Sequence, residues 1–169
     1  MSVHPLFPIC IKNSDAEIIL TPCPGTKGTD LTTSLAQIKE SGAQAVLTFM
    51  TQEELDKNEL SDIGKSVMEA GMSWFHLPII DDHAPEAPFL EAWINAGPAV
   101  HALLEQGKSI AVHCKGGSGR TGLICAQILL ERGEAIVPLM KRIQVVRPNA
   151  FTHACHRDYL TALDKSLKE

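Results

Sequence analysis

Residues 109–122 read SIAVHCKGGSGRTG, an apolar run followed by a cysteine, a glycine-rich turn and an arginine. Residues 109–112 predict a buried strand, and the turn leads into a helix that begins near Gly119 or Arg120. A turn of this kind collects backbone N–H groups and the positive end of a helix dipole at one point, which favours an anion. This stretch therefore predicts an α/β fold with an anion site at the end of a strand.

The residue types in this stretch add reactive chemistry to the anion site. A thiol normally has a pKa of about 8.5. A helix N-terminus and a neighbouring arginine favour the thiolate and make Cys114 a nucleophile. Arg120 can bind two phosphate oxygens through its planar guanidinium group, which a lysine could not do, and Thr121 can hydrogen-bond the sulfur as it leaves. The predicted phosphate-binding residues are Lys115, Gly116, Gly117, Ser118, Gly119 and Arg120.

Two other kinds of glycine-rich binding site are alternative interpretations of the same residues. Residues 117–122 match G-x-G-x-x-G, the dinucleotide fingerprint, but that fold requires a further strand and an acidic residue about 20 positions later. The chain after Gly122 instead shows helical patterns interrupted by Gly133 and Pro148. A Walker A loop fails as well, because an arginine replaces its lysine. A nicotinamide oxidoreductase is therefore the least favoured reading.

The stretch resembles the signature loop of the protein tyrosine phosphatase superfamily, His-Cys-five residues-Arg-Ser/Thr, which here is residues 113–121 and is called the signature loop below. The resemblance extends to the dual-specificity branch and most closely to the kinase-associated phosphatase (cyclin-dependent kinase inhibitor 3) group. It rests on TPCPGTKGTDL from residue 21 and HLPIIDDHAPE at residues 76–86, and covers about residues 17–165. It implies a cysteine-dependent phosphatase without a metal or other cofactor.

A phosphatase of this chemistry also needs a general acid, because an ester oxygen leaves badly as an alkoxide. Residues 78–85, PIIDDHAP, form a proline-bounded loop with two adjacent carboxyl groups and are called the acid loop below. Resemblance to the kinase-associated group favours Asp81, whereas the spacing in the phosphatases of regenerating liver would favour Asp82. Both aspartates remain candidates.

Composition is consistent with one globular domain over residues 1–169, with its core at about residues 17–165. The chain is 44% hydrophobic and 21% charged, and its net charge of −5 disfavours nucleic acid as a partner. Five irregularly spaced cysteines suggest a reducing compartment and show no zinc spacing, so we expect a cytoplasmic protein. No signal peptide and no membrane span are expected from the apolar runs.

The periodicity predicts a mostly parallel central sheet flanked by helices. Strands are expected at residues 16–20, 45–50, 74–77 and 109–112. Helices are expected at residues 31–41, 60–70, 89–106, 120–132, 134–146 and 152–167, with a loop at 78–88.

The sequence thus predicts a protein-tyrosine or dual-specificity phosphatase, a phosphoric monoester hydrolase. Its substrate would be a phosphoprotein carrying phosphotyrosine, phosphoserine or phosphothreonine, and a partner kinase is possible although the sequence does not identify one. The alternatives are a phosphatase of phosphoinositides, nucleotides or other small phosphates, and a phosphate-binding module without turnover.

Overall fold

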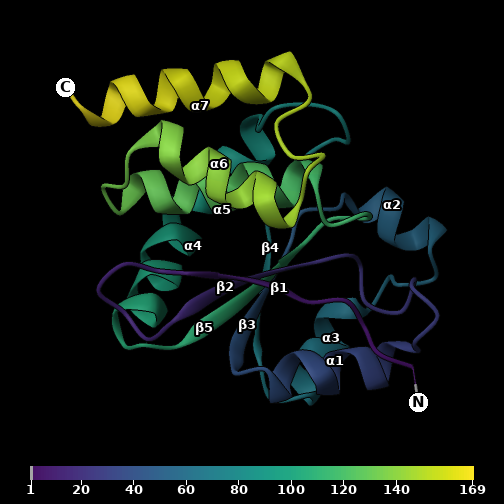
Figure 1. Cartoon of the computed structure of the whole chain (residues 1–169). Coiled ribbons are helices and arrows are strands. Elements are labelled where there is room, and N and C mark those ends of the chain that lie inside the picture. The colour runs from purple at the N-terminus through teal and green to yellow at the C-terminus, as the bar shows by residue number, and fades with distance from the viewer. Residues whose placement is uncertain (1) are drawn as a thin grey trace.

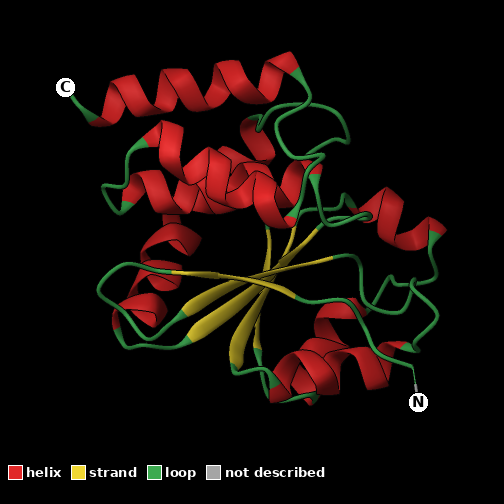
Figure 2. Ribbon diagram, viewed as in Figure 1, coloured by secondary structure: helices red, strands yellow, loops and turns green. Residues whose placement is uncertain are grey.

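Five short strands form one central sheet in the computed structural model, which describes residues 2–169 (Figures 1 and 2). The strands are β1 (Phe7–Cys10), β2 (Glu17–Thr21), β3 (Ala43–Thr48), β4 (Ser73–His76) and β5 (Ser109–His113). The helices are α1 (Leu31–Glu40), α2 (Gln52–Lys57), α3 (Ile63–Glu69), α4 (Ala87–Glu105), α5 (Gly119–Glu131), α6 (Ile136–Val146) and α7 (Ala154–Leu167).

The strand order β1-β2-β5-β3-β4 places β5 in the middle of the sheet. Only the β1–β2 pair is antiparallel, and β2, β5, β3 and β4 run parallel to one another. The carboxyl ends of parallel strands meet at one edge of a sheet, which is where open α/β folds place their ligands. The signature loop, which follows β5, therefore lies between the segments that follow β2 and β3.

Helices cover both faces of the sheet, as the near-continuous apolar strands require. In β3, Ala45 and Leu47 pack toward α4, α5 and α6, whereas Val46 packs toward α1 and α3. The same alternation runs through β2 and β5, since side chains along a strand point alternately to opposite faces. Helix α7 packs against α5 and α6 and adds the fully buried Leu160 to the core on that face (Figure 1).

The predicted elements are confirmed in type and order, with shifts of one to three residues at most ends. The all-helical segment after the signature loop is also confirmed, which removes the strand that a dinucleotide fold would need. The largest shift is at α3, which begins at Ile63 instead of residue 60.

Two elements were missing from the prediction. Strand β1 contains Pro8, a residue that argues against a central strand, and it is tolerated because β1 is an edge strand paired only with β2. Helix α2 is only six residues long, but Thr51 and Glu54 form a capping box at its start. That box is visible in the sequence as Thr-x-x-Glu and could have predicted the helix.

None of the helices in the described part of the chain combines the length and apolar character that crossing a membrane requires.

Candidate active site

The signature loop connects the last residue of β5, His113, to the first turn of α5. Cys114 is almost fully buried at 4% exposure, and the Thr121 Oγ1 atom donates a hydrogen bond to its sulfur over 3.1 Å. A hydroxyl donor at this distance can stabilise negative charge on sulfur. The predicted proximity of Thr121 to the Cys114 sulfur is therefore found in the structure.

The backbone of the signature loop is fixed from outside by two segments. Gly117 has a φ of 81°, and a Cβ atom there would lie 2.6 Å from the backbone nitrogen of Pro22, so only glycine fits. On another side, the Arg147 guanidinium group donates to the carbonyl oxygens of Gly116 (2.8 Å) and Gly117 (3.0 Å) and to the Ser118 hydroxyl (3.1 Å). The shape of the loop thus depends on residues before β3 and after α6.

Arg120 is the most buried charged group of the site, with 2% of its side chain exposed. Its Nη1 and Nη2 atoms donate to the two carboxylate oxygens of Glu54 over 2.7 and 2.9 Å, a bidentate pair. Nη1 also donates to the carbonyl oxygen of Ile79 over 2.8 Å, and Nη2 lies 3.5 Å from Asp81 Oδ1. Arg120 therefore joins α5 to α2 and to the acid loop.

Electrostatics reinforce this arrangement. Burial by itself would lower the pKa of Arg120, but its hydrogen bonds to Glu54 and its electrostatic interactions with Cys114, Glu54 and Asp81 raise that pKa above its ordinary value. Burial would likewise raise the pKa of Glu54, and its hydrogen bonds to Arg120 and Thr51 lower that pKa instead. Both groups of the pair are therefore held in their charged forms.

One donor of Arg120 has no partner. Its Nε–H group is buried and finds no hydrogen-bond acceptor anywhere in residues 2–169. An unsatisfied buried donor is costly, so such groups in native proteins call for an explanation. An anion held in the signature loop would supply the acceptor.

The structure separates the two candidate aspartates. Asp81 directs its carboxylate toward Arg120, whereas Asp82 lies 3.0 Å from His153 Nε2, just before α7. Both side chains are about two thirds exposed and both line the cleft that contains Cys114. The positions favour Asp81 as the group nearer to a bound anion, because Arg120 would contact that anion.

The cleft over Cys114 encloses about 300 Å³. Eight of the predicted site residues line it, whereas Gly117 packs against residues 21 and 22 and Thr121 lies beneath the sulfur. The lining residues are Asp81, Asp82, Cys114, Lys115, Gly116, Ser118, Gly119, Arg120, Asn149, Thr152 and His153. We call this space the Cys114 cleft.

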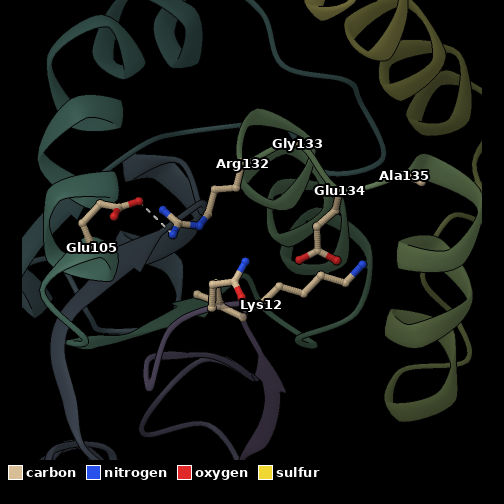
Figure 3. A pocket seen from close by; sticks show the side chains of 8 residues that line it. Lys12, Glu105, Arg132, Gly133, Glu134 and Ala135 are labelled. Atoms are coloured by element: carbon tan, nitrogen blue, oxygen red, sulfur yellow. Dashed lines mark ion pairs between the residues drawn. The ribbon is translucent and has the colours of Figure 1, made fainter.

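A larger cavity of about 520 Å³ lies at the opposite end of the sheet, between the end of β1 and the end of α4. Figure 3 shows the side chains that line it. It is lined by the segment after β1 and by the ends of α4 and α5, and Arg132 there pairs with Glu105 over 2.9 Å. The cavity contains no cysteine, histidine or serine among its lining residues. Its side chains therefore offer no nucleophile comparable to Cys114.

His113 and Cys114 occupy successive positions and belong to opposite faces of the sheet. The carbonyl oxygen of Cys114 can only accept, so His113 Nδ1 carries the proton and donates to it over 3.0 Å. Nε2 of the neutral ring then accepts from the Thr48 hydroxyl (2.7 Å), which in turn accepts from the Trp74 Nε1–H group (2.8 Å). This chain of hydrogen bonds fixes the orientation of the His113 ring, which in turn holds the carbonyl oxygen of Cys114.

Sequence reasoning missed Glu54 and gave Arg147 no role at the signature loop. Glu54 lies 66 residues before Arg120. Its place in a capping box indicates only the start of a helix and not a contact with an arginine. The backbone of another cysteine, Cys23, is bonded to the signature loop, since its N–H group donates to the carbonyl oxygen of Lys115 over 3.0 Å. Burial raises the pKa of the Cys23 thiol to about 12.

A buried cysteine at the end of a strand, an arginine at the start of the next helix and an α/β sheet are together the features of the cysteine phosphatase class. A family model described as a DSP-PTPase phosphatase of polymorphic toxin systems matches residues 24–134, and the chain belongs to this family. The resemblance to the dual-specificity branch is thereby confirmed.

Curated relatives and a solved structure agree with this assignment. The chain is 27% identical over 136 residues to cyclin-dependent kinase inhibitor 3 of Rattus norvegicus, a match that covers 78% of this chain and 63% of the relative. It is 26% identical to the Homo sapiens protein of the same name, over 70% of this chain and 57% of the relative. The matches thus span less than two thirds of each relative's length.

The structural comparison shows the fold. A crystal structure of kinase associated phosphatase, with serine substituted for its catalytic-site cysteine, superposes with a TM-score of 0.87 at 19% identity. The superposition covers 99% of this chain and 98% of that one. The predicted phosphatase fold is confirmed over essentially the whole chain.

Removing the charge of Glu54 should destabilise the protein, because Arg120 would keep a buried and uncompensated charge. We expect Glu54→Gln to lower the free energy of unfolding by about 2 kcal/mol at neutral pH, less than for a fully buried pair because Glu54 is partly exposed. Urea unfolding measures this, and Glu53→Gln, at an exposed pair with Lys57, is the matched control.

The pH dependence of that loss has a defined sign. The pKa of Glu54 is lowered in the folded protein, so its stabilisation is present above the ordinary value of 4.5 and is lost as the pH falls through the lower folded value. The difference between the wild type and Glu54→Gln should therefore shrink on acidification below pH 4.5. A difference that grows on acidification would contradict the assignment.

His113 should remain neutral through the physiological range. Its complete burial lowers its pKa to about 4, which outweighs the hydrogen bond to Cys114 that raises it. We expect the ¹⁵N chemical shifts of the ring to report a protonated Nδ1 and an unprotonated Nε2 between about pH 5 and 8. A titration of this ring near its ordinary value of 6.5 would show that the hydrogen-bond chain is wrong.

Proposed function

We propose that this chain hydrolyses phosphate monoesters of proteins, with Cys114 as the nucleophile and a phosphocysteine as the intermediate. The strongest support is Arg120, whose buried Nε–H group has no acceptor in the described residues and whose side chain lines the same cleft as Cys114. A guanidinium group offers Nε–H and Nη2–H as a planar fork that fits two phosphate oxygens. We also assign residues 1–169 to one phosphatase domain with its core at about 17–165.

The first step transfers the phosphoryl group to sulfur. Arg120 and the backbone N–H groups of residues 115–119 hold the equatorial oxygens, and the Cys114 thiolate attacks phosphorus while the bond to the ester oxygen breaks. Asp81, in its protonated form, gives its proton to that oxygen, so the substrate leaves as an alcohol or phenol. The 3.5 Å separation of Asp81 Oδ1 and Arg120 Nη2 supports this placement.

The second step returns the enzyme to its starting state. The Asp81 carboxylate takes a proton from a water molecule, whose oxygen attacks phosphorus while the phosphorus–sulfur bond breaks. Thr121, whose hydroxyl lies 3.1 Å from the sulfur, donates a hydrogen bond to the departing thiolate. Inorganic phosphate is released and Asp81 is protonated again.

The lining of the Cys114 cleft is compatible with more than one kind of phosphorylated side chain. No phenylalanine, tyrosine or tryptophan lines the Cys114 cleft, so its walls do not select an aromatic ring. We therefore propose phosphotyrosine and phosphoserine or phosphothreonine as substrates. The name of the curated relatives, cyclin-dependent kinase inhibitor 3, makes a kinase a partner worth testing, and unpaired cysteines are typical of the cytoplasm, which we propose as the location.

Replacing Cys114 by serine should abolish turnover while vanadate still binds. The signature loop and Arg120 would persist, but no base is placed to activate a serine hydroxyl. Hydrolysis of p-nitrophenyl phosphate and isothermal titration with vanadate measure the two properties. Retained turnover would refute the mechanism, and EDTA should have no effect on the wild type because no step uses a metal ion.

Leaving-group dependence decides between the two aspartates. Loss of a general acid slows a poor leaving group most, so Asp81→Ala should reduce kcat for an alkyl phosphate by about 10²–10⁴ and for p-nitrophenyl phosphate much less. Asp82→Ala is the matched comparison and should show a much smaller loss for the alkyl phosphate than Asp81→Ala. The reverse ranking would move the role to Asp82, and equal small effects would remove the acid loop from the mechanism.

Substrate class can be tested with a panel of equal phosphate concentration. We expect kcat/KM for phosphotyrosine and phosphothreonine peptides to exceed that for phosphoinositides and nucleotides, because Lys115 is the only lysine among the described residues that lines the Cys114 cleft and could receive a second phosphate. A preference for phosphoinositides or nucleotides would establish the alternative function.

A further inference from the structure

One residue of the acid loop has a backbone conformation that is uncommon outside glycine. Asp82 has a φ of 65°, in the left-handed region, which aspartate adopts more readily than most other residues but still at some cost. Within the loop, two hydrogen bonds support the turn: His83 N–H donates to Ile80 O (3.0 Å), and Asp82 N–H donates to Asp81 Oδ1 (3.1 Å). A strained conformation persists only when surrounding groups hold it.

The start of α7 and the residue before it supply those groups. His156 Nε2 lies 2.8 Å from the carbonyl oxygen of His83, and Cys155 Sγ lies 3.3 Å from the carbonyl oxygen of Asp82. His153 Nε2 lies 3.0 Å from the Asp82 carboxylate. Three contacts from residues 153–156 thus hold two consecutive residues of the turn, one of which has the strained backbone.

His156 is suited to a permanent contact. It is 1% exposed, and burial lowers its pKa, which keeps the ring neutral. A carbonyl oxygen can only accept, so Nε2 carries the proton and donates to His83. The His153 ring stands edge-on to the His156 ring at 5.1 Å between centroids, and it adds the contact to Asp82.

The opposite side of the acid loop is held by the signature-loop arginine. Arg120 donates to the carbonyl oxygen of Ile79 over 2.8 Å and faces Asp81 at 3.5 Å. The turn is therefore fixed between α5 on one side and α7 on the other. Without the α7 contacts, Asp81 would be held over the Cys114 cleft by Arg120, by the bonds inside the loop and by the Ile79 N–H group, which donates to the carbonyl oxygen of Phe49 over 2.9 Å.

We propose that His153 and His156 are positioning residues of the acid step, which hold the turn at Asp82 so that Asp81 stays beside Arg120. They act through Asp81 and touch neither the phosphoryl group nor the sulfur. The proposal rests on the proposed function, because a general acid is needed only if the chain hydrolyses phosphate esters.

Leaving-group dependence separates positioning of the acid from a general structural role. His156→Leu removes the donor but keeps the bulk, and His156→Gln retains an N–H group at about the same distance from the backbone. We expect His156→Leu to lower kcat for an alkyl phosphate about tenfold, with a loss of less than about threefold for p-nitrophenyl phosphate, and we expect His156→Gln to recover most of the activity. The matched control is His101→Leu, at a histidine of α4 that pairs with Glu131. This variant should keep the wild-type ratio of the two kcat values.

A double-mutant cycle gives the sharper test. If His156 acts through Asp81, the His156→Leu substitution should have no further effect on the alkyl phosphate once Asp81 is alanine. An equal loss on both substrates, or the same fold-loss with and without Asp81, would overturn the proposal. His153→Leu, at a partly exposed site, should show the same selectivity if His156→Leu fails to fold, and its failure to do so would also overturn the proposal.

The failures of the two proposals are distinguishable. A wild type without turnover of either substrate refutes the proposed function, and the positioning role with it. A wild type that turns over both substrates, combined with the selective defect of Asp81→Ala and none in the histidine variants, leaves the function intact and refutes only the positioning role.

Discussion

Arg120 carries its charge inside the protein, and the surrounding structure is organised to keep it there. Removing a guanidinium group from water costs several kcal/mol unless hydrogen bonds replace those lost. Glu54, at the start of α2, and the carbonyl oxygen of Ile79, in the acid loop, accept hydrogen bonds that replace those lost. Because one side chain receives both, the segments after β3 and β4 are fixed relative to the signature loop.

The sheet makes that convergence possible. The parallel strands β3, β4 and β5 end at the same edge, so residues 49–54, 79–81 and 114–120 meet although up to 71 residues separate them. The segment after β2 closes the other side, where Gly117 approaches residues 21 and 22 too closely for any side chain. The hydrogen-bond chain from Trp74 through Thr48 to His113 adds a third fixed point at the carbonyl oxygen of Cys114. A preorganised site of this kind does not need to reorganise when charge develops on a bound phosphoryl group.

The site residues that could be predicted from the sequence are those that lie close to one another along the chain. Cys114, Arg120 and Thr121 lie within eight residues, and one strand–turn–helix unit brings them together whatever the rest of the fold does. Glu54 was not predicted, because a glutamate in a capping box carries no sign of the arginine it meets across the sheet edge. The choice between Asp81 and Asp82 depended on family analogy, since adjacent carboxylates differ only in what faces them, Arg120 in one case and His153 in the other. Strand β1 escaped prediction because its pairing with β2, and not its own pattern, makes it a strand.

The central claim is that the phosphoryl group passes through the sulfur of Cys114, and rapid acid quench followed by peptide mass spectrometry tests it most directly. During turnover of p-nitrophenyl phosphate, the peptide containing Cys114 should carry one phosphoryl group, which appears within the first turnover and disappears when substrate is exhausted. The Arg120→Lys variant should accumulate far less of this species, because a lysine keeps the charge but loses the planar fork. Steady turnover by the wild type with no phosphorylated Cys114 at any quench time, or with the phosphoryl group on another residue, would contradict the account.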